Sequence, residues 1–146
     1  MFDKILLATD GSDGALHAAG QAAEIARKFN SKVTVTYVVQ PPMPVTTIAD
    51  MPGVSIDPTY VSRYMEETGN AVSRRTGKVL EEAGVNYDVR VEMGHPAESI
   101  INVATEGRYN LIVIGSRGLS GIKSFFLGSV SDRVAHLAHC PVLIVR

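Results

Sequence analysis

The sequence predicts an α/β fold, an open five-stranded parallel sheet with helices on both faces. Short apolar segments alternate with amphipathic helical stretches from one end of the chain to the other. Most of the apolar segments lack polar alternation, which is typical of strands buried in a parallel sheet. The 146 residues, 45% of them hydrophobic, suit one domain spanning residues 1–146.

The first third of the chain is predicted to form a strand, a helix and a second strand. Apolar residues dominate Lys4–Thr9 and Lys32–Val39, and small residues at helical spacing predict a helix over Asp13–Phe29. The apolar face of this helix comprises Ala15, Ala19, Ala22, Ala26 and Phe29. Its alanines favour close packing against a sheet.

A proline-rich segment and a long helix follow. The prolines of Gln40–Asp57 exclude a continuous helix and predict a long irregular loop. A helix is expected over Pro58–Ala83, stopped by Gly84 and weakened inside by Gly69 and Gly77. Its apolar side is expected to comprise Val61, Tyr64, Met65, Thr68, Ala71, Val72, Val79 and Leu80.

A half-exposed strand and a third helix come next. Apolar and polar residues alternate between Val85 and Met93, which is the pattern of an edge strand with one face in water. A helix opened by Pro96 is expected to end near Glu106.

The chain then adds a strand, a helix and a final strand. Leu111–Ile114 is an apolar run of the buried type, and a glycine-rich loop follows it. A last helix is expected to begin at Gly128 and Ser129, with an apolar face formed by Val130, Val134 and Leu137. Val142–Val145 is expected to be the fifth strand.

Right-handed crossovers, with the third strand at an edge, favour the strand order 3-2-1-4-5. This order places the first and fourth strands side by side, where the winding of the sheet reverses, and open α/β sheets bind ligands at such a reversal. Two polar loops, Ala8–Ser12 and Gly115–Gly118, follow these strands. The order therefore predicts that both loops line one crevice.

The loop between residues 115 and 129 is suited to bind phosphate. Glycines leave room for a ligand, and the following helix presents unpaired N–H groups at its positive end. No Asp or Glu occurs in residues 107–131, which contain the basic residues Arg108, Arg117 and Lys123. Glycine and serine also serve an ordinary turn and helix cap, so the glycines alone leave both interpretations open.

Charge and composition exclude several function classes. The 14 basic and 15 acidic residues form no long run, so neither nucleic acid nor a membrane is expected as a partner. The sequence shows no signal peptide and no apolar run of the roughly 20 residues that span a bilayer, so we expect a soluble cytoplasmic protein. Cys140 is the single cysteine, which excludes an intramolecular disulfide and a cysteine zinc cluster.

The fifth strand predicts self-association. Val142–Val145 lies at the end of the strand order, yet it is apolar without alternation. An apolar strand at the edge of a sheet favours pairing with a strand of another chain. We therefore expect a homodimer formed through this strand.

These features resemble the universal stress protein family over essentially the whole chain. The resemblance lies in the start Lys4–Ser12, in Gly94–Ala97 before the third helix and in the end His139–Val145. The spacing Gly115-x2-Gly118-x9-Gly128-Ser129 resembles the motif of the ATP-binding branch of that family. The resemblance implies a flavodoxin-like or Rossmann-like fold of the adenine nucleotide hydrolase-like group, ATP in the crevice and dimerisation through the last strand.

The resemblance also implies which residues contact the nucleotide. Those expected at the ribose and phosphates are Gly115, Gly118, Gly128 and Ser129, with the backbone N–H of Val130. Ser116 and Arg117 line the same loop. Asp10 would bind ribose hydroxyls or a hydrated divalent ion, and without the motif an Asx turn or helix cap explains it equally well. Ala8 and Thr9 would flank the base. The main chain of Val39 would pair with the adenine edge.

Mg²⁺ is expected to accompany ATP, held mainly through phosphates and water. No cluster of His, Cys, Asp and Glu predicts a dedicated metal site, and the four histidines are expected to have surface or capping roles. The sequence lacks the P-loop spacing that ends in Gly-Lys-Ser/Thr, and no second carboxylate is aimed at the crevice. We therefore expect no catalytic residues and no enzyme activity beyond slow ATP hydrolysis.

Nucleotide sensing is the role that this pattern favours. ATP would order residues 116–127, including the Phe125–Phe126 pair, and so change a surface read by a client protein or by the dimer partner. The phenylalanines could instead pack under the loop. The client, the stress signal and assembly beyond a dimer are not encoded in any recognisable motif.

Three alternatives have their own signatures. A phosphate-accepting receiver domain needs an acidic cluster, and Asp10 has no adjacent acid. An enzyme that makes or cleaves an adenylate would carry a Ser-Gly-Gly-type loop where this chain has Thr9–Ser12. A scaffold that works without nucleotide, or with AMP or a cyclic nucleotide, is compatible with the sequence.

Overall fold

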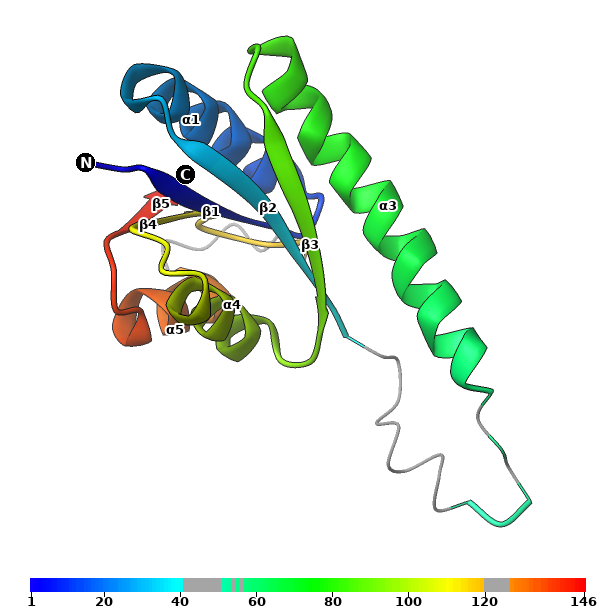
Figure 1. Cartoon of the computed structure of the whole chain (residues 1–146). Helices are drawn as coiled ribbons and strands as arrows, with labels where there is room; N and C mark the ends of the chain where they lie inside the picture. The colour runs from blue at the N-terminus through cyan, green and yellow to red at the C-terminus, as the bar shows by residue number, and fades with distance from the viewer. Residues whose placement is uncertain (41–50, 54, 56, 120–126) are drawn as a thin grey trace.

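The computed structural model contains a five-stranded parallel sheet in the order β3-β2-β1-β4-β5 (Figure 1), as predicted. It describes residues 1–40, 51–53, 55, 57–119 and 127–146. The strands are β1, Lys4–Thr9; β2, Lys32–Val39; β3, Tyr87–Met93; β4, Leu111–Gly115; and β5, Val142–Val145. The helices are α1, Asp13–Phe29; α3, Pro58–Glu82; α4, Pro96–Glu106; and α5, Ser129–Leu137.

The boundaries differ from the predicted ones mainly between α3 and β3. Helix α3 ends one residue early, and Gly84 follows with a φ of +71°, the left-handed conformation of a helix stop. The Val85 N–H donates to the Leu80 carbonyl at 2.9 Å, so Val85 belongs to the turn and β3 begins two residues later. Most of the predicted loop Gln40–Asp57 lies outside the described residues.

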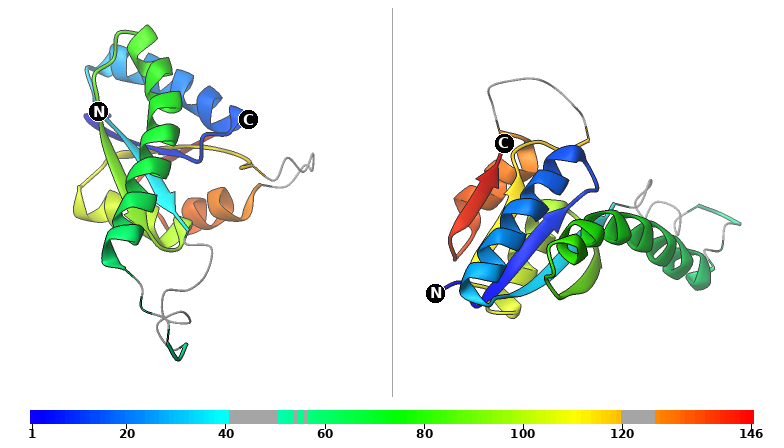
Figure 2. Two further views of the ribbon diagram at one scale, coloured as in Figure 1. Left: turned by 90° about the vertical axis from the view of Figure 1, so that its right-hand side faces the viewer. Right: turned by 90° about the horizontal axis from the view of Figure 1, so that it is seen from above.

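Helices cover both faces of the sheet, as Figures 1 and 2 show. Helices α1 and α3 lie on one face, where the alanines of α1 pack with Leu80 against the apolar side chains of β1 and β2. Helices α4 and α5 lie on the other face, where Ile100 and Val134 pack against β1 and β4. Both cores therefore meet across β1, whose residues Ile5, Leu6 and Leu7 are fully buried.

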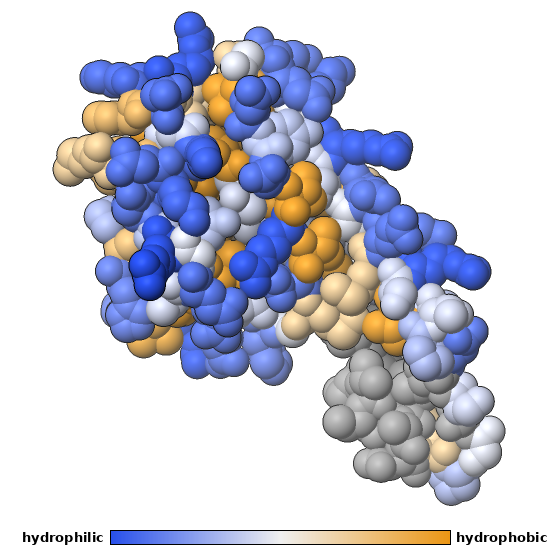
Figure 3. Space-filling model, viewed as in Figure 1, coloured by the Kyte–Doolittle hydropathy of each residue, from blue (hydrophilic) through white to orange (hydrophobic). Residues whose placement is uncertain are grey.

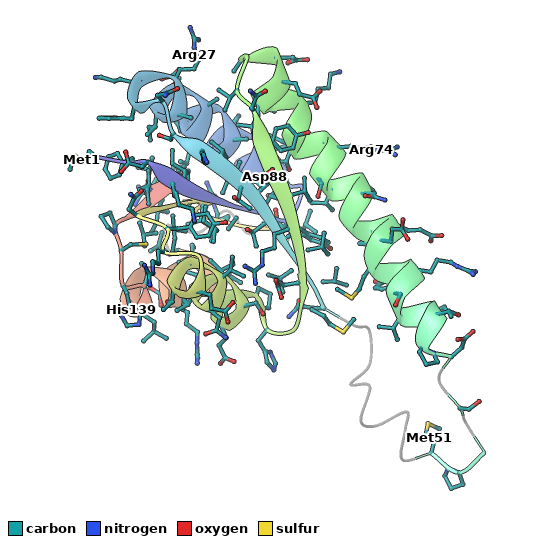
Figure 4. All side chains as sticks on the ribbon, in the orientation of Figure 1. Met1, Arg27, Met51, Arg74, Asp88 and His139 are labelled. Atoms are coloured by element: carbon teal, nitrogen blue, oxygen red, sulfur yellow. The ribbon has the colours of Figure 1, made fainter. Side chains whose placement is uncertain are left out.

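Helix α3 buries small residues against the sheet together with Leu80 of the predicted apolar side, most of which is half-buried. Its buried residues are Gly69, Ser73, Thr76, Gly77 and Leu80. Ala71, predicted on the apolar side, is exposed. A Cβ on Gly77 would collide with Tyr87, and one on Gly69 would lie 2.7 Å from Val91 Cγ2. The helix glycines therefore permit a close approach to β3, while Arg74 projects into solvent (Figure 4).

The two edges of the sheet have different surfaces. Edge strand β3 mixes charged residues with exposed Val89, and Figure 3 shows apolar surface interrupted by hydrophilic side chains on this side of the molecule. Arg90 in β3 pairs with Glu92 and, at 3.3 Å, with Glu106 of α4. Edge strand β5 consists of four half-buried apolar residues. Within the described ranges, no helix has the length and apolarity to cross a membrane.

Two glycine-to-alanine variants test the close contact of α3 with β3. A Cβ on Gly20 of α1 meets nothing within 4 Å, so Gly20→Ala should raise the free energy of unfolding by about 0.5–1 kcal/mol through helix propensity. Gly69→Ala should lower it by about 1–2 kcal/mol, because overpacking against Val91 exceeds that gain. Urea denaturation measures both, and equal stabilisation of the two variants would contradict the contact.

Candidate functional site

A crevice opens where the sheet reverses. Strand β1 pairs in parallel with β4, with Ala8 opposite Ile114, so the loops that follow the two strands leave the same edge. The cavity between them has a volume of about 470 Å³, within the range of about 300–1,000 Å³ typical of small-molecule sites. Strand β2, the start of α4 and the start of α5 complete its walls.

The loop after β1 is held in one conformation by its own side chains. Asp10 Oδ1 accepts a hydrogen bond from the Ser12 N–H at 2.9 Å, which forms an Asx turn. Gly11 has a φ of +77°, and Ser12 Oγ caps α1 by accepting from the Ala15 N–H at 3.2 Å. Thr9 Oγ1 lies 2.8 Å from Thr76 Oγ1 of α3. The turn expected as the alternative role of Asp10 is thus present, and it leaves Asp10 Oδ2 beside the loop after β4.

The other wall is the start of α5. The Ser116 carbonyl accepts hydrogen bonds from the Gly128 N–H at 2.7 Å and from Ser131 Oγ at 3.0 Å. Helix α5 begins at Ser129 with Gly128 as its N-cap, and no side chain of the described residues caps it. Its first N–H groups therefore lie at the crevice without a capping side chain, the arrangement that favours an anion.

The charge of the crevice is small and mixed. Among its described lining residues, Asp10 and Arg117 are the only charged ones. A Cβ on Gly118 would lie 2.7 Å from Asp10 Oδ2, so the two loops are nearly in contact. Burial raises the pKa of the Tyr37 phenol, and the nearby Tyr64 and Asp10 raise it further. Tyr37 borders the crevice, but strand alternation turns its side chain toward the α1 and α3 side of β2, opposite to that of Val38.

The structure brings together nine of the eleven predicted contact residues. Those that line the cavity are Ala8, Thr9, Asp10, Gly115, Arg117, Gly118, Gly128, Ser129 and Val130. Ser116 does not line it: the residue is buried, and its carbonyl accepts the hydrogen bonds that position the start of α5. Val39 does not line it either. Its side chain is on the α1 and α3 side of β2, and its carbonyl accepts from the Gly94 N–H at 3.1 Å.

Sequence reasoning missed an apolar part of the lining. It is formed mainly by Thr36, Val38, Pro96, Ile100 and Ile114. Val38 belongs to the same buried cluster as Ala8 and Ile100. Strand alternation could have selected Val38 over Val39, because neighbouring strand residues face opposite sides of the sheet. The residues Gln40 and Tyr37 also border the cavity.

The described lining offers hydrogen-bonding groups but little catalytic chemistry. It contains one carboxylate and no histidine, cysteine or lysine. Across the part of the chain that the structure describes, no three His, Cys, Asp or Glu side chains are grouped as a metal site. His139 precedes β5 and lies at the other end of the sheet (Figure 4). Phe125 and Phe126 lie outside the described residues.

Comparison with known proteins relates the whole chain to one family. The model of the "Universal stress protein family" matches residues 1–146. The universal stress protein YxiE of Bacillus subtilis is 37% identical over 153 aligned positions that cover 100% of both chains.

Solved structures share the fold. The universal stress protein UspA from Lactobacillus plantarum superposes with a TM-score of 0.73 at 24% identity, over 99% of this chain and 98% of that one. A crystal structure of a universal stress protein in complex with cAMP superposes with a TM-score of 0.70 at 28% identity, over 99% of this chain and 96% of that one.

Alanine at two crevice glycines should show which of them is packed tightly against backbone and which contacts only a side chain. A Cβ on Gly115 would lie 3.0 Å from the backbone of Gly14, which cannot move alone, so Gly115→Ala should lower the free energy of unfolding by about 2–3 kcal/mol. A Cβ on Gly118 meets only the Asp10 side chain, so Gly118→Ala should change it by less than about 1 kcal/mol. Equal losses in thermal unfolding would refute the packing of β4 against α1.

Proposed function

The chain belongs to the universal stress protein family, and from this membership and its crevice we propose that it binds ATP as a nucleotide-dependent module of the stress response. One observation carries the proposal. The start of α5, without a capping side chain among the described residues, lies across a 470 Å³ cavity from the Asp10 loop. An anionic group fits the start of α5, and a polyol fits the Asp10 loop.

The crevice has a separate place for each of the three parts of the nucleotide: the phosphates, the ribose and the base. Its phosphates would lie at the N–H groups of Ser129 and Val130, beside Arg117. Its ribose would hydrogen bond to Asp10 Oδ2, because Oδ1 is already used by Ser12. Its base would enter the apolar part between Val38 and Ile100. The cAMP complex of a 28% identical universal stress protein supports an adenine nucleotide as the class of ligand.

The residues present fit Mg²⁺ only as a companion of the phosphates. One carboxylate, Asp10, lines the described crevice. Mg²⁺ keeps several waters and commonly takes its other ligands from phosphates. As the alternative to its contact with the ribose, Asp10 Oδ2 would hold one of those waters, and the ion would neutralise phosphate charge.

Binding and signalling fit the crevice better than turnover. Efficient phosphoryl transfer needs a positioned nucleophile and stabilisation of the charge that develops. The described lining supplies one acid and one guanidinium, and Asp10 is held in its turn. We therefore propose slow hydrolysis at most, in a cytoplasmic protein whose nucleotide state is read by a client protein. Phosphate release above about 1 s⁻¹ would contradict this, because typical kinases turn over at about 1–100 s⁻¹.

ATP binding is tested on the purified protein. Chromatography of what the denatured protein releases should show an adenine nucleotide, and calorimetric titration of the stripped protein should show ATP binding. Gly118→Val should weaken ATP binding at least about a hundredfold, or about 2.8 kcal/mol, because the side chain fills the gap beside Asp10. Gly20→Ala, outside the crevice, is the matched control and should bind as the wild type does.

Each outcome of that titration is informative. AMP or cAMP binding tighter than ATP would shift the proposal to that nucleotide at the same site. Failure of all three to bind the wild type would refute nucleotide binding. Unchanged ATP affinity in Gly118→Val would refute the assignment of the loop.

We also propose a homodimer through β5. This strand is an edge, and its four apolar residues are half-buried in the single chain, whereas the other edge strand, β3, carries charges that discourage pairing. Sedimentation velocity at micromolar concentration should show a dimer, and Gly118→Val should sediment alike because its substitution lies outside β5. A wild type that sediments only as a monomer would contradict the proposed homodimer.

A further inference from the structure

The buried hydroxyl of Thr36 has no hydrogen-bond partner among the described residues. Thr36 lies in the middle of β2, opposite Ala8 on β1 and Arg90 on β3. It is 1% exposed, and its Oγ1 makes no hydrogen bond to any described residue. A buried hydroxyl without a partner destabilises a protein, so most such groups are satisfied. Thr36 also lines the crevice.

The buried hydroxyls of Ser31 and Ser73 also lack a partner among the described residues, but neither residue lines the cavity, and the other strand threonines are paired. The described strands contain three threonines: Thr9, Thr34 and Thr36. Thr9 Oγ1 is paired with Thr76 Oγ1 at 2.8 Å, and Thr34 Oγ1 accepts from the Tyr109 hydroxyl at 2.9 Å. Thr34 is two residues before Thr36 and therefore faces the same side of the sheet. The exception is the threonine that lies at the cavity.

The cavity wall around Thr36 is mainly apolar, and its charged cross-strand neighbour Arg90 is paired with Glu92 and Glu106. On its side of the sheet, the crevice is lined by Ala8, Val38, Ile100 and Ile114, which belong to one buried cluster, and by Pro96. These side chains can contact the faces of a flat ring but cannot hydrogen bond to its edge. The charged residues Asp10 and Arg117 belong to the loops after β1 and β4 instead. A ligand with an apolar face and a polar edge fits this part of the crevice.

We propose that Thr36 recognises the base of the bound nucleotide, its Oγ1 hydrogen bonding to the polar edge of the adenine. The inference rests on the proposed nucleotide site. In the described conformation the hydroxyl is shielded from solvent, so this bond requires a step to another staggered χ1 rotamer that turns Oγ1 toward the cavity. The hydroxyl donates to a ring nitrogen or accepts from the exocyclic amine, and either bond satisfies the group that the protein leaves unpaired.

The test compares Thr36→Val, which replaces the hydroxyl by a methyl group, with Thr36→Ser, which retains it. Calorimetric titration of the full chain with ATP, AMP and cAMP measures each affinity. Loss of one buried hydrogen bond should weaken binding to Thr36→Val about three-fold to ten-fold. The factor should be the same for all three ligands, because they share the base and differ in the phosphates. Thr36→Ser should bind within about two-fold of the wild type.

Thr34→Val is the matched control. It removes the bond to Tyr109 and does not alter a cavity residue, so it should lower the melting temperature and leave the three affinities unchanged. Thr36→Val should keep the melting temperature of the ligand-free protein at or above the wild-type value. Unchanged affinities in Thr36→Val, or a loss confined to one nucleotide, would overturn the inference. A wild type that binds none of the three would instead refute the proposed function.

Discussion

The parallel pairing of β1 with β4 is the constraint on which the rest of the molecule depends. It reverses the winding of the sheet, brings the loops after both strands to one edge and places buried cores on both faces of β1. The contact is tight at its end, where a Cβ on Gly115 would lie 3.0 Å from the backbone of Gly14. A crevice can therefore form there because small residues let strand, loop and helix approach closely.

The crevice combines two physical environments that a nucleotide needs together. Its polar end is formed by backbone groups at the start of α5 and by Asp10, which the fold orients through Ser116 and Ser12. Its apolar end is formed by side chains of the core between β1, β2, β4 and α4. Charge contributes little, since one acidic and one basic residue line the described part. In the proposed nucleotide complex, shape and hydrogen bonding would therefore contribute more than side-chain charge.

Helix α3 is connected to the crevice through the loop after β1. Thr76 hydrogen bonds to Thr9, Arg75 pairs with Asp13 at 2.9 Å, and Val72 fills the space beside Gly11. Because α3 otherwise contacts the sheet mainly through small residues, these contacts join it to the same turn that orients Asp10. The long helix is therefore in contact with the loop that forms one wall of the candidate site.

The strand order and the position of the two loops were predictable from the sequence, because strand periodicity, crossover handedness and glycine spacing are local or topological properties. The tertiary structure alone decided which side chains enter the crevice. Val38 lines the crevice in place of Val39, since neighbouring strand residues point to opposite faces of the sheet. Ser116 does not line it, and its carbonyl accepts from the Gly128 N–H at the start of α5. It also decided that α3 buries glycines, because Tyr87 and Val91 of a distant strand occupy that space. The unpaired hydroxyl of Thr36 is likewise invisible in sequence, since only packing shows which threonines lack a partner.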